Sequence, residues 1–75
     1  MDILEFYRYA EQLGELVITH GSELIRTYGR TPEQILADGG FRVNVRDFRS
    51  MILDYGLSEE EAFVRTMDWM YRKLA

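Results

Sequence analysis

Apolar or small residues recur at every third or fourth position over the first third of this chain. The positions are Ile3, Tyr7, Ala10, Gly14, Val17, Gly21, Leu24 and Tyr28. A 3/4 spacing sustained over about three heptads or more places these side chains on one face of an α-helix. The pattern therefore predicts a helix over about residues 2–28 whose apolar face is buried.

Two positions of this row are glycines, and a glycine inside a helix costs about 1 kcal/mol relative to alanine. We expect the close approach of another helix to offset that cost. Two arrangements are open. Gly14 and Gly21 pack against the last helix of the same chain, or two copies of the first helix pair antiparallel in a homodimer. The candidate seam for either contact consists of Tyr7, Ala10, Gly14, Val17, Gly21 and Leu24.

The continuity of this first helix depends on the segment around Gly21. His20, Gly21 and Ser22 resemble a helix stop, with a histidine in the last turn, a left-handed glycine cap and a serine that restarts the chain. Against a stop, the 3/4 spacing keeps its phase across Gly21. We therefore expect a continuous or gently kinked helix.

Two capping boxes predict the starts of two later helices. In each, a Ser or Thr is followed three residues later by Gln or Glu, so that side chains satisfy free backbone N–H groups at the helix start. Thr31 begins a short helix over about residues 32–37, with Pro32 in its first position. Ser58 begins the last helix, over about residues 59–74.

The segment between these two helices contains the remaining main helix. Phe41 to Val45 alternates apolar and polar residues, but no second candidate strand exists to pair with it. We therefore interpret it as an extended link, with Asn44 capping a helix over about residues 44–55. The sequence predicts an all-α fold: a compact bundle of three main helices and one short helix, forming a single domain over residues 1–75.

Composition limits what this domain can contain. A chain of 75 residues without cysteine has no disulfides, so association with a partner or a second copy is an economical further source of burial. A net charge of −4 disfavours nonspecific binding to nucleic acid or acidic membranes. The chain shows no membrane-length apolar run and no signal-peptide pattern. We therefore expect a cytoplasmic protein without membrane contact.

Residues suited to catalysis or metal binding are few. His20 is the single histidine, and Glu23 is the one potential ligand at helical spacing from it. Two ligands do not complete a metal site, and no cysteine is present to add a third. The serines lack a neighbouring base. We expect no enzyme activity, no catalytic residues, no metal and no other cofactor.

Nucleic-acid binding is the alternative function. Arg42, Arg46 and Arg49 recur at helical spacing beside Asn44, and these residue types read guanine and adenine edges. A short helix, a glycine turn and this Arg-bearing helix give the outline of a small helix-turn-helix-like DNA-binding regulator. The acidic balance, Asp47 on the same helix and a turn longer than the motif normally has argue against it.

Protein binding draws on the largest number of residues. Ten aromatic side chains exceed what one small core covers, and exposed aromatics near arginine anchor many interfaces. The candidate partner-binding residues are Phe6, Tyr9, Trp69 and Tyr71. We predict a small non-catalytic protein–protein interaction module (an adaptor, regulator or stoichiometric inhibitor) that binds another protein, itself, or both. Size and charge resemble those of small phage and mobile-element proteins that block host machinery.

Overall fold

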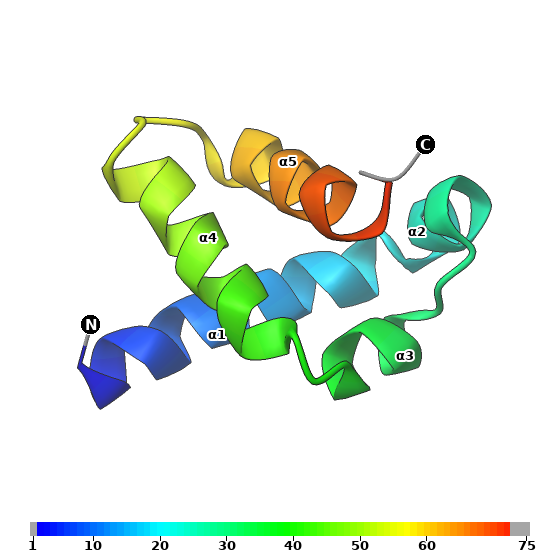
Figure 1. Cartoon of the computed structure of the whole chain (residues 1–75), viewed down its shortest axis with the longest axis horizontal. Coiled ribbons are helices and arrows are strands. Elements are labelled where there is room, and N and C mark those ends of the chain that lie inside the picture. Colours follow the sequence, from blue (N-terminus) through cyan, green and yellow to red (C-terminus); the bar gives the residue numbers. More distant parts are fainter. Residues whose placement is uncertain (1, 73–75) are drawn as a thin grey trace.

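The computed structural model describes residues 2–72 and confirms an all-α bundle. It contains α1 (Ile3–Thr19), α2 (Gly21–Tyr28), α3 (Pro32–Ala37), α4 (Phe41–Leu53) and α5 (Glu59–Tyr71). In Figure 1, α4 crosses α1 and packs beside α5, while α2 and α3 close one end of the molecule. The core therefore lies where α1, α4 and α5 meet.

The continuous first helix is the main error of the sequence prediction. The chain leaves the helical conformation at His20 (φ −101°, ψ 24°), so two helices occupy the predicted range. Gly21 is the first residue of α2, and within residues 2–72 only Gly29 and Gly56 adopt a positive φ. The left-handed glycine cap considered for Gly21 is therefore also wrong.

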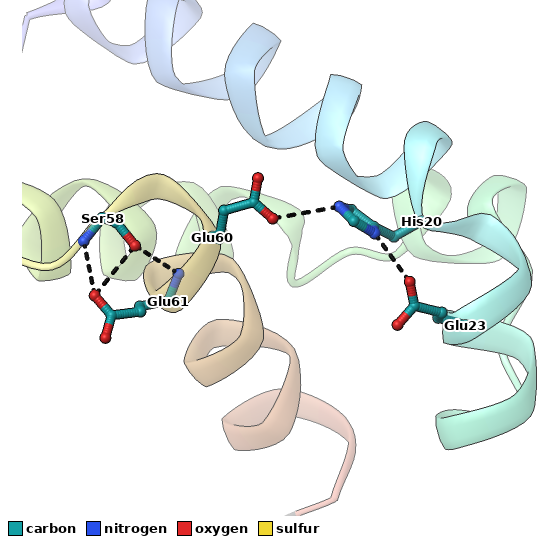
Figure 2. Close-up of polar contacts among 5 residues, drawn as sticks. All are labelled: His20, Glu23, Ser58, Glu60 and Glu61. Atoms are coloured by element: carbon teal, nitrogen blue, oxygen red, sulfur yellow. Dashed lines mark hydrogen bonds and ion pairs between the residues drawn. The ribbon is translucent and has the colours of Figure 1, made fainter.

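Tertiary contacts explain the break at His20. Its ring stacks on Phe63 with 5.3 Å between centroids, and Nε2 lies 3.7 Å from Glu60 Oε2 on α5 (Figure 2). The apolar phase survives the break because Val17 on α1 and Leu24 on α2 both reach the same core. The 3/4 spacing shows that residues of both helices are buried in the same core. It does not require that the two helices be one continuous helix.

The buried face of α1 is rotated from the predicted row. Tyr9, Leu13 and Val17 are its buried residues, whereas Ile3 and Tyr7 are 67% and 61% exposed. The crossing of α4 sets this direction, since the ring of Phe48 packs edge-to-face against Tyr9 at 6.4 Å between centroids. Of the predicted seam, Val17 and Leu24 are buried, Ala10, Gly14 and Gly21 are half-buried, and Tyr7 is exposed.

The glycines of the seam face α3 of the same chain. A Cβ at Gly21 would lie 2.9 Å from Pro32 Cγ, and one at Gly14 would lie 3.9 Å from Leu36 Cδ2. Close approach therefore does explain Gly21, but the neighbour is α3 and not the last helix. The long first helix through which a dimer was predicted is interrupted at His20, and the dimer itself stays a prediction.

Local capping signals are confirmed. Thr31 and Ser58 each form a complete capping box (the second appears in Figure 2), and Gly29 ends α2 in the left-handed conformation. The last helix ends at Tyr71 in the structure, and positions 73 and 74 of its predicted range lie outside the described residues.

The start of α4 differs from the prediction. The helix begins at Phe41, so the extended link over Phe41 to Val45 is wrong. Asp38 Oδ1 accepts a hydrogen bond of 2.7 Å from the Gly40 N–H, and the Asn44 N–H donates to the Gly40 carbonyl at 3.0 Å. These bonds begin the helix three residues early, so Asn44 is an interior residue and not its cap.

Among residues 2–72, ten buried side chains form the hydrophobic core, and they come from all five helices. They are Tyr9, Leu13, Val17, Leu24, Ile35, Val45, Phe48, Ala62, Phe63 and Met67. Within the predicted helices over residues 44–55 and 59–74, Val45, Phe48, Phe63 and Met67 are buried, whereas Tyr55 is 74% exposed. Within the described part of the chain, no helix has the length and apolarity needed to cross a membrane.

Candidate interaction surface

Residues from three separate predictions meet where α4 crosses the start of α1. Phe6, Tyr7, Arg42, Val43 and Arg46 form what we call the α1–α4 surface. Phe6, Arg42, Val43 and Arg46 line a hollow of about 360 Å³. The rings of Phe6 and Tyr7 pack edge-to-face at 5.8 Å, and the Arg42 guanidinium lies 5.8 Å from the Phe6 centroid. Aromatic and arginine side chains thus share one patch.

The start of α1 is held in place beside this patch. Asp2 caps α1 by accepting a hydrogen bond of 2.8 Å from the Glu5 N–H. The Glu5 side chain then pairs with Arg49 on α4, with 2.8 Å between Oε1 and Nε. This ion pair joins the two helices, so the patch lies on packed elements. It also commits Arg49 to a contact inside the chain.

The α1–α4 surface is basic on an acidic protein. Arg42 and Arg46 lie one helical turn apart and are exposed, and neither forms an ion pair with another residue between 2 and 72. Tyr7 and Val43 expose 61% and 47% of their areas beside them. The patch therefore offers apolar contact area next to two positive charges on a chain of net charge −4.

A second exposed aromatic group lies further along α4. Met51 and Tyr55, with Trp69 from α5, line a hollow of about 320 Å³ that also includes Asp47. We call this the Trp69 surface. Asp47 follows Val43 by one turn on α4, so the two hollows lie along neighbouring turns of its exposed face. Trp69 itself is 60% exposed.

The four candidate partner-binding residues have different environments. Phe6 is half-buried at the α1–α4 surface and Trp69 is exposed, so both are accessible to a partner. Tyr9 is 8% exposed and belongs to the core, which contradicts its place in this set. Tyr71 is half-buried, and its hydroxyl donates a hydrogen bond of 3.2 Å to Asp38 Oδ2.

The four candidate nucleic-acid-binding residues also differ in their exposure and contacts. Arg42 and Arg46 are exposed, whereas Asn44 is fully buried and Arg49 is paired with Glu5. Asn44 therefore does not reach a base edge in this fold. The objection that the turn is too long for a helix-turn-helix is removed, however, because residues 38–40 alone join α3 to α4. A turn of that length fits the helix-turn-helix outline.

A network of tyrosines, arginines and carboxylates ties the end of α5 to α2 and to the α3–α4 turn. The Tyr28 hydroxyl donates to Asp68, and the rings of Tyr28 and Tyr71 lie 6.2 Å apart. Burial, together with Asp68, raises the pKa of Tyr28 to about 12. Burial, together with Asp38, likewise raises the pKa of Tyr71 to about 12. Both phenols are held neutral as donors.

Sequence reasoning missed Val43 and Tyr55. Val43 lay in the segment interpreted as a link, and a helix beginning at Phe41 would have placed it one turn before Asp47 on the outer face. Tyr55 lies at the end of the predicted helix over residues 44–55, but α4 ends at Leu53 before reaching it. Among residues 2–72, no group of three or more His, Asp or Glu side chains is placed to hold a metal ion.

No family model, curated protein or solved structure matches the chain.

Proposed function

We propose that this protein is a small non-catalytic interaction module that binds another protein through the α1–α4 surface. The cytoplasm is the compartment in which we expect it to act. The observation that carries the proposal is the meeting of exposed Tyr7 and Val43 with Arg42 and Arg46, which have no ion-pair partner among the described residues.

The chemistry of the patch supports a protein partner. Aromatic and arginine side chains supply most of the binding energy at protein interfaces, because they combine large contact area with directed hydrogen bonds. Two arginines one turn apart fit carboxylates at the rim of a partner's interface. The Trp69 surface extends the same exposed side of α4, so a larger partner has further contact area there.

Capture from a lysate of the native cells tests the proposal. The immobilised wild-type protein is compared with a Tyr7→Ala plus Arg46→Ala variant and with a matched control, Ile18→Ala plus Arg26→Ala. Ile18 and Arg26 are also exposed, and the control removes the same charge. We expect the partner to be lost with the first variant and retained by the control.

Light scattering on the purified protein supplies the other measurement. A dimer that dissociates on Tyr7→Ala would identify a second copy as the partner. A monomer whose captured proteins are the same for wild type and the Tyr7→Ala plus Arg46→Ala variant would contradict the proposal.

DNA binding is the second candidate, favoured by the short turn between α3 and α4 and by exposed Arg42 and Arg46. It predicts retention on duplex DNA at about 50 mM salt with a steep salt dependence, because bound arginines release counterions from the phosphates. Arg42→Ala plus Arg46→Ala would abolish that retention. Passage of the wild type through the DNA column at this salt concentration would exclude the DNA-binding function.

A further inference from the structure

A groove of about 330 Å³ separates α2 from α5, on elements that do not contribute to the α1–α4 surface. The break at His20 directs α2 so that the groove has a bridge near each end. At one end His20 lies between Glu23 and Glu60 (Figure 2), and at the other Tyr28 donates to Asp68. The volume lies near the lower end of the roughly 300–1,000 Å³ typical of binding pockets.

The floor of the groove is apolar and firmly packed. Leu24 from α2 and Phe63 and Met67 from α5 line it, and all three belong to the hydrophobic core. Such a floor accepts the alkyl part of a long side chain without rearrangement. The ring of Tyr28 stands at the edge, and an arginine of the chain, Arg72, already lies 5.5 Å from its centroid.

The rim of the groove is predominantly negative. Glu23, Glu60 and Asp68 place three carboxylates around it, and the single guanidinium, that of Arg72, pairs with Asp68 at 3.9 Å between Nε and Oδ1. The side chains of Glu23 and Glu60 are 66% and 73% exposed, so they can turn toward a ligand. The contacts to His20 engage one oxygen of each glutamate, which leaves the other oxygen to accept a further hydrogen bond.

These features select among ligand classes. An anion meets the repulsion of Glu23 and Glu60, and a purely apolar segment would remove the water around these carboxylates without replacing its hydrogen bonds. A lysine or arginine side chain satisfies both parts of the groove. Its alkyl stem covers the apolar floor while its charged head remains at the acidic rim.

We propose that the α2–α5 groove binds a basic, amphipathic segment of a partner protein by inserting one of its arginine or lysine side chains. The site has the opposite charge to the α1–α4 surface and lies on different helices. Together with the α1–α4 surface of the proposed function, this groove gives the protein two candidate docking sites, one suited to an acidic and one to a basic surface.

Fluorescence anisotropy tests this proposal with a labelled amphipathic peptide of leucine, alanine and arginine, about 15 residues long so that it can form a helix. The site variant is Glu23→Gln plus Glu60→Gln, which keeps the shape of both side chains. The control is Glu11→Gln plus Glu15→Gln, which removes the same charge from the exposed face of α1. Circular dichroism checks that both variants fold.

We expect the site variant to bind the peptide about tenfold more weakly, as the loss of two partly exposed charge pairs implies. The control should bind within about twofold of wild type. Equal weakening in both variants would show attraction by net charge alone and would overturn the proposal, as would an absence of binding to wild type. Displacement of the peptide by equimolar spermidine would overturn it in favour of a free polyamine.

Discussion

Gly21 and Pro32 are packed so closely that no other residue type fits at position 21 without movement. A Cβ at Gly21 would lie 2.9 Å from Pro32 Cγ, inside the normal range of carbon–carbon contacts. Pro32 is the first residue of α3 and is fixed there by its own ring and by the capping box of Thr31. The start of α2 and the start of α3 therefore approach each other through a glycine.

Alanine at the two seam glycines should have opposite effects on stability. Gly21→Ala should lower the free energy of unfolding by about 1–2 kcal/mol, because the new methyl displaces the proline ring. Gly14→Ala should raise it by about 1 kcal/mol, since its Cβ would meet Leu36 at an ordinary contact distance and alanine favours the helix interior. Urea unfolding of both variants measures the difference. A gain in stability for Gly21→Ala would contradict the packing described.

The features predicted correctly from the sequence are those set by neighbouring residues. The capping boxes at Thr31 and Ser58 depend on contacts three residues apart, and both form as expected. The break at His20 depends on Glu60 and Phe63, which lie far along the chain. The local sequence His20-Gly21-Ser22 allowed a helix stop, but it does not reveal these long-range contacts, and the unbroken apolar phase favoured one helix.

The candidate surface has the same division between local and long-range causes. The helical spacing of Arg42 and Arg46 is visible in the sequence, and so is an aromatic surplus near the start of α1. That Arg42 lies over Phe6 follows from the crossing of α4 over α1, which only packing determines. The start of α4 at Phe41 places Asn44 in the helix interior, where its side chain is fully buried.

Asn44 offers a test of that burial. Asn44 is fully buried, and neither its amide nitrogen nor its amide oxygen has a hydrogen-bond partner among the described residues. The Tyr71 phenol lies nearby, and Asn44 lowers the pKa of this phenol, against the larger opposite effects of burial and Asp38. Replacing an unsatisfied polar group by an apolar one of similar shape relieves its desolvation, so Asn44→Leu should stabilise the protein by about 1 kcal/mol. Asn44→Asp should destabilise it by more than that, because it buries a charge. Thermal unfolding of the two variants measures both effects, and a stabilising Asn44→Asp would place this residue at the surface.

Stability should fall steeply in alkaline solution because of Tyr28 and Tyr71. Burial, with a neighbouring carboxylate, raises each pKa from 10.0 to about 12, so the folded state holds these protons more tightly than the unfolded state. The resulting stabilisation is complete below pH 10 and is lost between pH 10 and pH 12. A Tyr28→Phe plus Tyr71→Phe variant should lose less stability across that interval. Urea unfolding at several pH values measures it, and identical slopes for variant and wild type would refute the assignment.

Two tyrosines of α1 distinguish the surface from the core. Tyr9 packs against Phe48 and is 8% exposed, so Tyr9→Ala should cost about 3 kcal/mol of stability through the cavity it leaves. Tyr7 is 61% exposed, and Tyr7→Ala should change stability by less than about 0.5 kcal/mol. Binding should show the reverse order: Tyr7→Ala loses the partner while folded, whereas Tyr9→Ala retains it wherever the protein remains folded. Chemical unfolding and partner capture on the same preparations measure both properties. If Tyr7→Ala lowered the free energy of unfolding as much as Tyr9→Ala, Tyr7 would be a core residue and not part of the α1–α4 surface.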